Sequence, residues 1–206
     1  MTKGAAPDAS YENRSFGAPG AERTVVLLRS GVSTLSDPRP DATARRDARI
    51  VAVGLTIDDI DDPAAYRGAT PAEATASAIA RFVTEESHGR PVGLVGVGEA
   101  GELAVMVAAH LGENVDRLAL VAVPRPESEL GASEVAELLD RIAAKTLLMN
   151  GQADPTAASG AAEWFKKHLA SARVEMVPRT DDPDARLILA DVWERVLSHV
   201  APATVR

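Results

Sequence analysis

The sequence predicts an α/β protein with a doubly wound, mostly parallel sheet of six strands or slightly more. Short apolar runs rich in β-branched residues recur along the chain, as in parallel strands that are covered on both faces. They occupy residues 24–28, 49–53, 92–97, 118–123, 146–149 and 174–177. Helical patterns separate most of these runs, and this alternation implies right-handed crossover connections.

Five helices are predicted, at residues 71–86, 102–111, 133–143, 157–169 and 185–200. The first has a clear N-terminal signal, because Thr70 suits the N-cap, Pro71 the first helical position and Glu73 the first turn. Residues 11–16 favour a short edge strand, although residues 1–20 suit a loose tail equally well. We therefore assign residues 1–20 to a tail or edge strand and residues 21–206 to a single domain.

Composition limits the classes of function. A net charge of −8 disfavours a large nucleic-acid interface, which needs a basic face. The chain has no cysteine, so disulfides, thiolate catalysis and cysteine-based metal sites are excluded. No apolar run approaches the roughly 20 residues that span a bilayer. We expect a cytoplasmic protein with no cofactor, no metal, no nucleic-acid partner and no membrane partner.

A glycine-rich turn joins a predicted strand to a predicted helix, within residues 92–101, Val-Gly-Leu-Val-Gly-Val-Gly-Glu-Ala-Gly. This segment resembles the nucleophile elbow of the α/β-hydrolase family. Three further segments resemble that family in the same order, namely the oxyanion-hole strand and loop at 24–31, the helix–turn–strand at 108–124 and the acid-bearing strand at 145–155. The resemblance spans roughly residues 20–202 and implies an α/β-hydrolase-like fold with a minimal lid or none.

The departures from the family pattern fall on its catalytic residues. The resemblance places Gly98 where the family has its serine, and Asp182 where it has its histidine. Arg29 replaces the histidine of the oxyanion loop, and Ala100 replaces the second glycine of the elbow motif. Only Asp154 matches, at the position of the acid. The resemblance thus implies a protein without a Ser-His-Asp triad. We expect the four histidines, His88, His110, His168 and His199, to be surface or packing residues.

The carboxyl ends of the predicted strands carry a polar rim. Ligands gather at this edge of an open α/β sheet, and the backbone N–H groups at a helix N-terminus bind anions there. The predicted ligand-binding residues are Arg29, Ser30, Gly98, Glu99, Ala100, Arg125, Asp154, Arg179 and Asp182. Each also has a structural explanation, as a loop charge in water, a helix cap or a partner of the helix dipole.

These observations favour a non-catalytic protein that binds an anionic or polar small molecule or a protein partner. An alternative is an ester or thioester hydrolase with a non-standard catalytic set, in which Asp154 and Asp182 activate a water or Ser30 or Ser33 substitutes as the nucleophile.

A second alternative is NADP binding, since residues 96–101 also fit Gly-x-Gly-x-x-Gly. The next strand then ends in Pro124 and Arg125, where NAD-binding proteins have an acidic residue, and an arginine suits a 2′-phosphate. A homodimer is also predicted as a possibility, through edge helices such as residues 185–200 with Trp193, although core packing explains Trp193 equally well.

Overall fold

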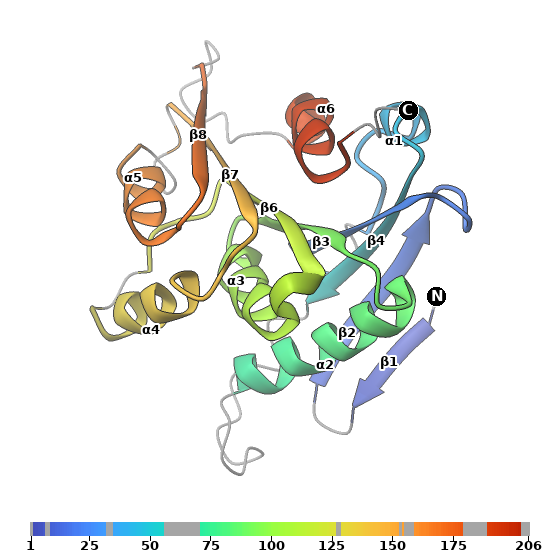
Figure 1. Ribbon diagram of the computed structural model, residues 1–206, viewed down its shortest axis with the longest axis horizontal. Coiled ribbons are helices and arrows are strands. Elements are labelled where there is room, and N and C mark those ends of the chain that lie inside the picture. The colour runs from blue at the N-terminus through green and yellow to red at the C-terminus, as the bar shows by residue number, and fades with distance from the viewer. Residues whose placement is uncertain are drawn as a thin grey trace.

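The computed structural model describes residues 2–6, 9–31, 35–55, 71–126, 129–152, 154, 159–178 and 189–202. These residues form an eight-stranded sheet in the order β1-β2-β4-β3-β5-β6-β7-β8 (Figure 1). The strands are β1 (Thr2–Ala6), β2 (Ala9–Phe16), β3 (Arg23–Ser30), β4 (Ala48–Leu55), β5 (Val92–Val97), β6 (Val115–Val121), β7 (Lys145–Gly151) and β8 (Ala172–Val177).

The predicted fold class is confirmed, and the six predicted strands are the six parallel strands of the sheet, β3 to β8. The sheet is larger than six strands because β2 pairs antiparallel with β4, and β1 pairs antiparallel with β2. Strand β2 contains the segment predicted as an edge strand but lies one position inside the edge. Strand β6 ends at Val121, two residues earlier than predicted, because Ala122 takes a positive φ of 52° that interrupts the extended chain.

The helices are α1 (Pro40–Arg45), α2 (Pro71–Ser87), α3 (Ala100–Leu111), α4 (Glu129–Leu139), α5 (Ser159–His168) and α6 (Leu189–Val200). All five predicted helices are present. Helix α4 begins and ends four residues earlier than predicted, since the chain leaves the helix at Asp140 and continues through short turn hydrogen bonds, such as that from the Ile142 N–H to the Leu139 carbonyl (3.0 Å). Helix α1 was not predicted, because it is only six residues long. The predicted cap Thr70 and residues 185–188 lie outside the described residues.

Two apolar cores lie on opposite faces of the sheet. Helices α2 to α5 cover one face and helices α1 and α6 the other (Figure 1). The first core includes Val107 of α3 and Phe165 of α5, and the second includes Val196 of α6. Trp193 is fully buried in the second core, so core packing accounts for this side chain.

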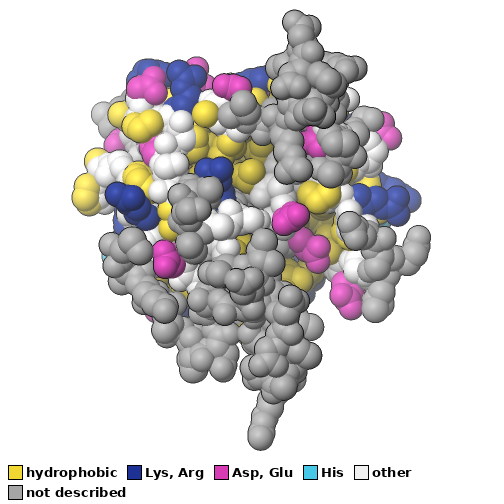
Figure 2. Space-filling model, turned by 180° about the vertical axis from the view of Figure 1, so that it is seen from behind, with side chains coloured by type: hydrophobic (Ala, Val, Ile, Leu, Met, Phe, Trp, Pro, Cys, Tyr) yellow, Lys and Arg dark blue, Asp and Glu magenta, His cyan; other side chains and the backbone are white. Residues whose placement is uncertain are grey.

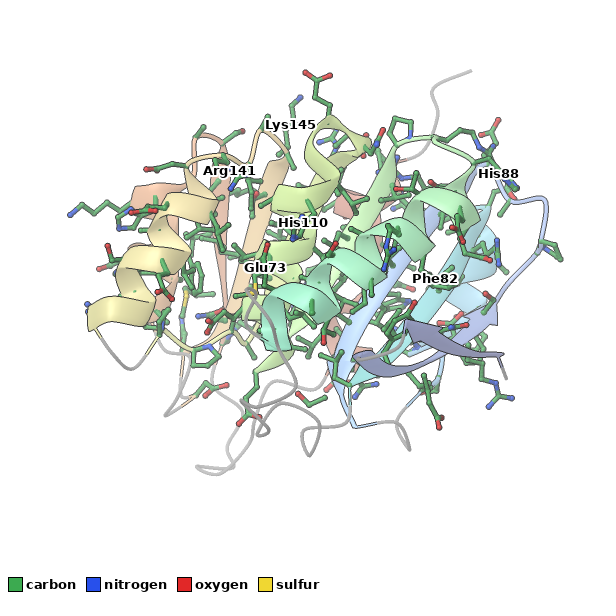
Figure 3. All side chains as sticks on the ribbon, turned by 90° about the horizontal axis from the view of Figure 1, so that it is seen from below. Glu73, Phe82, His88, His110, Arg141 and Lys145 are labelled. Carbon is green, nitrogen blue, oxygen red and sulfur yellow. The ribbon has the colours of Figure 1, made fainter. Side chains whose placement is uncertain are left out.

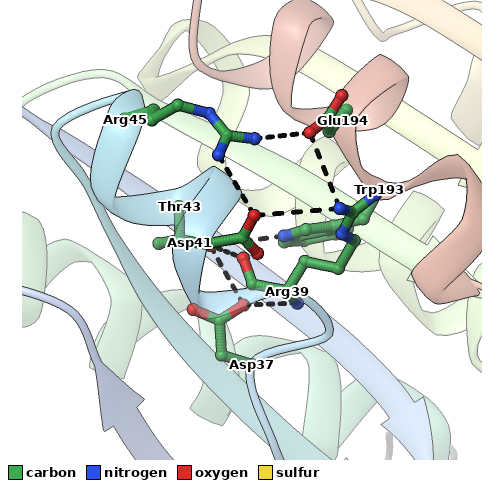
Figure 4. A network of polar contacts seen from close by, with 7 residues as sticks. All are labelled: Asp37, Arg39, Asp41, Thr43, Arg45, Trp193 and Glu194. Atoms are coloured by element: carbon green, nitrogen blue, oxygen red, sulfur yellow. Dashed lines mark hydrogen bonds and ion pairs between the residues drawn. The ribbon is translucent and has the colours of Figure 1, made fainter.

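Polar contacts tie the short helix α1 to α6 around this tryptophan (Figure 4). The indole Nε1–H of Trp193 donates to the Thr43 hydroxyl at 3.3 Å, and that hydroxyl donates to an Asp37 carboxylate oxygen at 3.0 Å. Arg45 of α1 reaches Glu194 of α6 at 2.5 Å. The buried tryptophan therefore has a partner for its polar atom, as a buried indole normally requires.

No helix among the described residues is both long enough and apolar enough to cross a membrane. On the face seen in Figure 2, the described basic and acidic side chains are interspersed with apolar ones.

Candidate functional site

The strand order identifies the edge of the sheet at which a ligand is expected. From β3 the chain passes to β4 on one side and then crosses to β5 on the other, so that β3 lies between β4 and β5. The two neighbouring strands β3 and β5 therefore flank a topological switch point. In open α/β sheets, ligands bind in the crevice outside the carboxyl ends of such strands. Here those ends carry Arg29 and Ser30 on one strand, and Gly98 and Glu99 after the other.

The turn after β5 has the geometry of a sharp strand-to-helix elbow. Gly98 adopts a left-handed φ of +57°, which L-residues with side chains rarely take. Its N–H donates to the Val121 carbonyl at 2.9 Å, and its own carbonyl accepts from the Gly101 N–H at 3.0 Å. Among the described residues, no atom lies within 4 Å of a Cβ built on Gly98. The described residues thus leave open space at the elbow, where a side chain would stand.

The other two glycines of this turn have a packing role. A Cβ at Gly96 would lie 2.5 Å from the Cβ of Ala104, and a Cβ at Gly101 would overlap the side chain of Val123. Both glycines allow α3 to lie close against β5 and β6. Close packing and the turn together account for all three glycines of the Gly-x-Gly-x-x-Gly pattern.

Helix α3 begins next to this open space. Ala100 is buried as its first residue, whereas Glu99 precedes the helix, is exposed and makes no capping hydrogen bond with its side chain. By position, the N–H groups of the first turn of a helix lack intrahelical partners and carry the positive end of the helix dipole. The elbow therefore presents a partial positive charge at the carboxyl edge of the sheet.

Two arginines stand at the same edge. Arg29, at the end of β3, is half-buried, and its burial lowers the pKa of the guanidinium below its ordinary value. A desolvated cation interacts more strongly with an anion than a hydrated one does. The Arg125 guanidinium lies over the ring of Trp164, 5.9 Å from its centroid. Trp164 belongs to α5 and was not predicted as a site residue, since no local pattern links it to Arg125.

Asp154 follows β7 and is buried, with 4 % of its surface exposed. Its N–H donates to the Gly151 carbonyl at 3.3 Å, which closes a turn at the end of the strand. The structure therefore places the matching acid at the same edge of the sheet as the elbow. The predicted site residues Arg179 and Asp182 lie outside the described residues, as does Ser33.

None of the four histidines belongs to the turn after β5, and each lies in or next to a helix. His199 of α6 contacts the backbone carbonyls of β6 and β7. The Nε2 atom of His110 in α3 lies 2.9 Å from a carboxylate oxygen of Glu73 in α2 (Figure 3). His168 packs against Trp164 with ring centroids 4.9 Å apart, and His88 lies in the turn after α2. Among the described residues, no group of three His, Asp or Glu side chains is arranged to hold a metal ion.

A separate cavity of about 310 Å³ lies near the start of β4, at the opposite edge of the sheet. Phe16, Pro40, Ala44 and Ala48 contribute apolar surface to it, and Asp37 and Asp47 contribute carboxylates. None of the predicted site residues lines this cavity.

No protein-family model matches the sequence, and no curated protein matches it. Solved structures of α/β hydrolases do match the fold. The carboxylesterase CesB (YbfK) from Bacillus subtilis is 15 % identical, with a TM-score of 0.69 over 98 % of this chain and 92 % of that one. Est1E from Butyrivibrio proteoclasticus, solved with ferulic acid, is 8 % identical, with a TM-score of 0.69 over 96 % of both chains.

A predicted CIB-like hydrolase from Thermoplasma acidophilum is 14 % identical, with a TM-score of 0.66 over 95 % of this chain and 93 % of that one. At these identities the likeness shows the fold, which is α/β-hydrolase-like.

Proposed function

We propose that this α/β-hydrolase-like chain binds an anionic or polar small molecule at the carboxyl edge of its sheet, without the acyl transfer of a serine hydrolase. The observation that carries the proposal is Gly98. Its φ of +57° places it at the strained position of an elbow, yet it offers no hydroxyl to attack a carbonyl. The open space beside it leaves room for a ligand group.

The charges around this space favour an anion. The N–H groups of Glu99 and Ala100 lie at the positive end of α3, a position that binds carboxylates and phosphates without a special side chain. Arg29 and Arg125 add two cations at the same edge of the sheet. Trp164 orients Arg125 and offers an apolar surface beside it. A small carboxylate with an apolar body matches this combination.

A second candidate function is ester or thioester hydrolysis by a non-standard catalytic set. The buried carboxyl of Asp154 supports it, because this residue matches the acid of the hydrolase family and is 4 % exposed. The fold supports it too, since solved structures with this fold include carboxylesterases and a thioesterase domain. In such an enzyme, Asp154 would orient or activate a water, and the α3 N-terminus would stabilise the developing oxyanion.

NADP binding gains no support from the described residues. Packing against Ala104 and Val123 explains Gly96 and Gly101, so these glycines need no pyrophosphate to account for them. Stabilisation by NADP that an enlarged side chain at position 98 abolishes would favour this function instead.

Turnover of activated short-chain esters and thioesters separates the two leading candidates. We expect rates equal to buffer for the wild-type protein and for Asp154→Ala, with circular dichroism confirming that the variant folds. Clear wild-type activity that Asp154→Ala abolishes would overturn the proposal and establish the hydrolase.

Ligand binding is tested by thermal shift with small aliphatic and aromatic carboxylates and inorganic phosphate. We expect concentration-dependent stabilisation of the wild-type protein that Arg125→Ala weakens at least several-fold. Arg90→Ala is the matched control, because Arg90 is exposed and lies just before β5, at the opposite edge of the sheet. Equal weakening by both variants would indicate a nonspecific charge effect and contradict the proposed site.

A further inference from the structure

Strand β8 ends the sheet on one side. It pairs with β7 along its whole length, from Ala172 opposite Thr146 to Val177 opposite Gly151, and no strand among the described residues pairs with its outer side. Figure 1 shows it at the upper left of the sheet. An unpaired strand edge presents a row of N–H and C=O groups, which is a template for pairing with another strand.

The two faces of β8 differ in chemistry. Ala172 and Val174 pack partly against the first core, on the face that α5 covers. Arg173 and Glu175 point to the other face, where Arg195 of α6 donates to Glu175 at 2.7 Å. The side chain of Arg173 is 64 % exposed, and its guanidinium lies 3.9 Å from Glu175. The edge strand thus carries one cation and one anion, two positions apart on the same face.

This spacing is self-complementary. Two copies of β8 that pair antiparallel with Val174 opposite the partner's Val174 place Arg173 opposite the partner's Glu175, and Glu175 opposite the partner's Arg173. Directly opposed side chains lie about 5 Å apart, and opposite charges there are favourable. Shifting the register by two residues in either direction would oppose Arg173 or Glu175 to its own copy, which is unfavourable.

We propose that β8 is the interface through which a second copy of this chain pairs antiparallel, centred on Val174, so that the two sheets become continuous. The occupant of the edge is a second copy because the Arg173–Glu175 pattern complements itself. The two-fold axis also joins two partly buried apolar side chains, Val174 and the partner's Val174, on the opposite face.

Sedimentation velocity on the wild-type chain and two charge variants tests this pairing. We expect a wild-type dimer at twice the 21.6 kDa mass of one chain. Arg173→Glu and Glu175→Arg each oppose like charges twice across the axis, and each raises the dimer dissociation constant about tenfold or more. An equimolar mixture of the two variants restores the dimer, because every opposed pair is then of opposite sign.

Arg195→Ala is the matched control, since it removes the contact to Glu175 within one chain and leaves the strand edge intact. We expect its dimer to persist. A monomeric wild-type protein overturns the proposal, and so does a dimer that neither charge variant weakens or that the mixture fails to restore.

Cysteine cross-linking tests the register independently. It needs no charge reversal, so its result does not depend on how well the fold tolerates one. The chain has no cysteine, so one introduced at position 174 can bridge only to its own copy. We expect Val174→Cys to form an intermolecular disulfide under mild oxidation, since the two positions are directly opposed. Arg173→Cys, whose copies lie diagonally and farther apart, forms it much more slowly. Equal rates for the two variants would contradict the proposed register.

Discussion

Single glycines decide the geometry of the candidate site, and they do so for two different reasons. Gly98 supplies a left-handed backbone conformation in open space. Gly101 has no space for a side chain, because Val123 fills it. The sequence shows both as glycine, so residues 96–101 resemble an elbow and also fit the pattern of a dinucleotide loop. The neighbours of each residue distinguish the two roles.

Alanine substitutions at these glycines therefore have different costs. Gly101→Ala overpacks the contact with Val123 and lowers the free energy of unfolding by about 1–3 kcal/mol. Gly98→Ala meets no atom of the described residues but takes a strained φ, at a cost of about 1–2 kcal/mol. Gly160→Ala is the control, since its Cβ enters open space in α5 and we expect a gain of up to about 1 kcal/mol. Urea unfolding measures all three, and a neutral Gly101→Ala would contradict the packing role.

Helix α6 is held to the sheet at its C-terminal end. The Nε2–H of His199 donates to the Lys145 carbonyl at 2.9 Å and to the Leu118 carbonyl at 3.1 Å. Arg23 of β3 donates to the Val200 carbonyl at 2.9 Å. These bonds satisfy backbone groups where α6 crosses the starts of β6 and β7. His199 is thus a packing residue of the fold rather than part of the candidate site.

This histidine makes stability depend on pH. Burial lowers the pKa of His199 below its usual 6.5, and the positive charges of Arg117 and Arg173 lower it further, against the two carbonyl hydrogen bonds. Below about pH 6.5, His199 is protonated in the unfolded chain more readily than in the folded protein. The free energy of unfolding therefore decreases as the pH falls. We expect the wild-type Tm to fall more steeply between pH 7.5 and 5.5 than the Tm of His199→Gln.

His88→Asn is the control for that comparison, because His88 is exposed in a turn with a positive φ that asparagine tolerates. We expect its Tm to follow pH as the wild type does. Parallel Tm curves for wild type and His199→Gln would show that His199 titrates normally in the folded protein.

The sheet separates two apolar cores, and no side chain of the described residues belongs to both. Val107 lies in the core under α3 and Val196 in the core under α6, and both are fully buried. Each core is held together largely by Val, Leu, Ile and Ala. Because the sheet lies between them, the packing around one valine does not depend on the other.

We expect Val107→Ala and Val196→Ala each to lower the free energy of unfolding by about 1–3 kcal/mol. In the double variant, the two losses add to within about 0.5 kcal/mol, as is usual for sites without shared contacts. Chemical denaturation of the four proteins measures this cycle. A coupling above 1 kcal/mol would mean that the cores communicate through the sheet.

The sequence pattern alone predicted the six parallel strands, the five longer helices and the glycine-rich elbow. Apolar periodicity is a local property, and a strand or helix that must bury one or both faces shows it in its own residues. The carboxyl edge could be predicted as the candidate site for the same reason, because parallel strands end at one side of the sheet.

Only the tertiary structure decided how residues far apart in the chain meet. It paired β2 with β4, buried Trp193 against Thr43, and set Trp164 beneath Arg125. It also left β8 at the end of the sheet. No local pattern encodes the contacts of Trp193 and Trp164, because each joins residues that lie tens of positions apart in the chain.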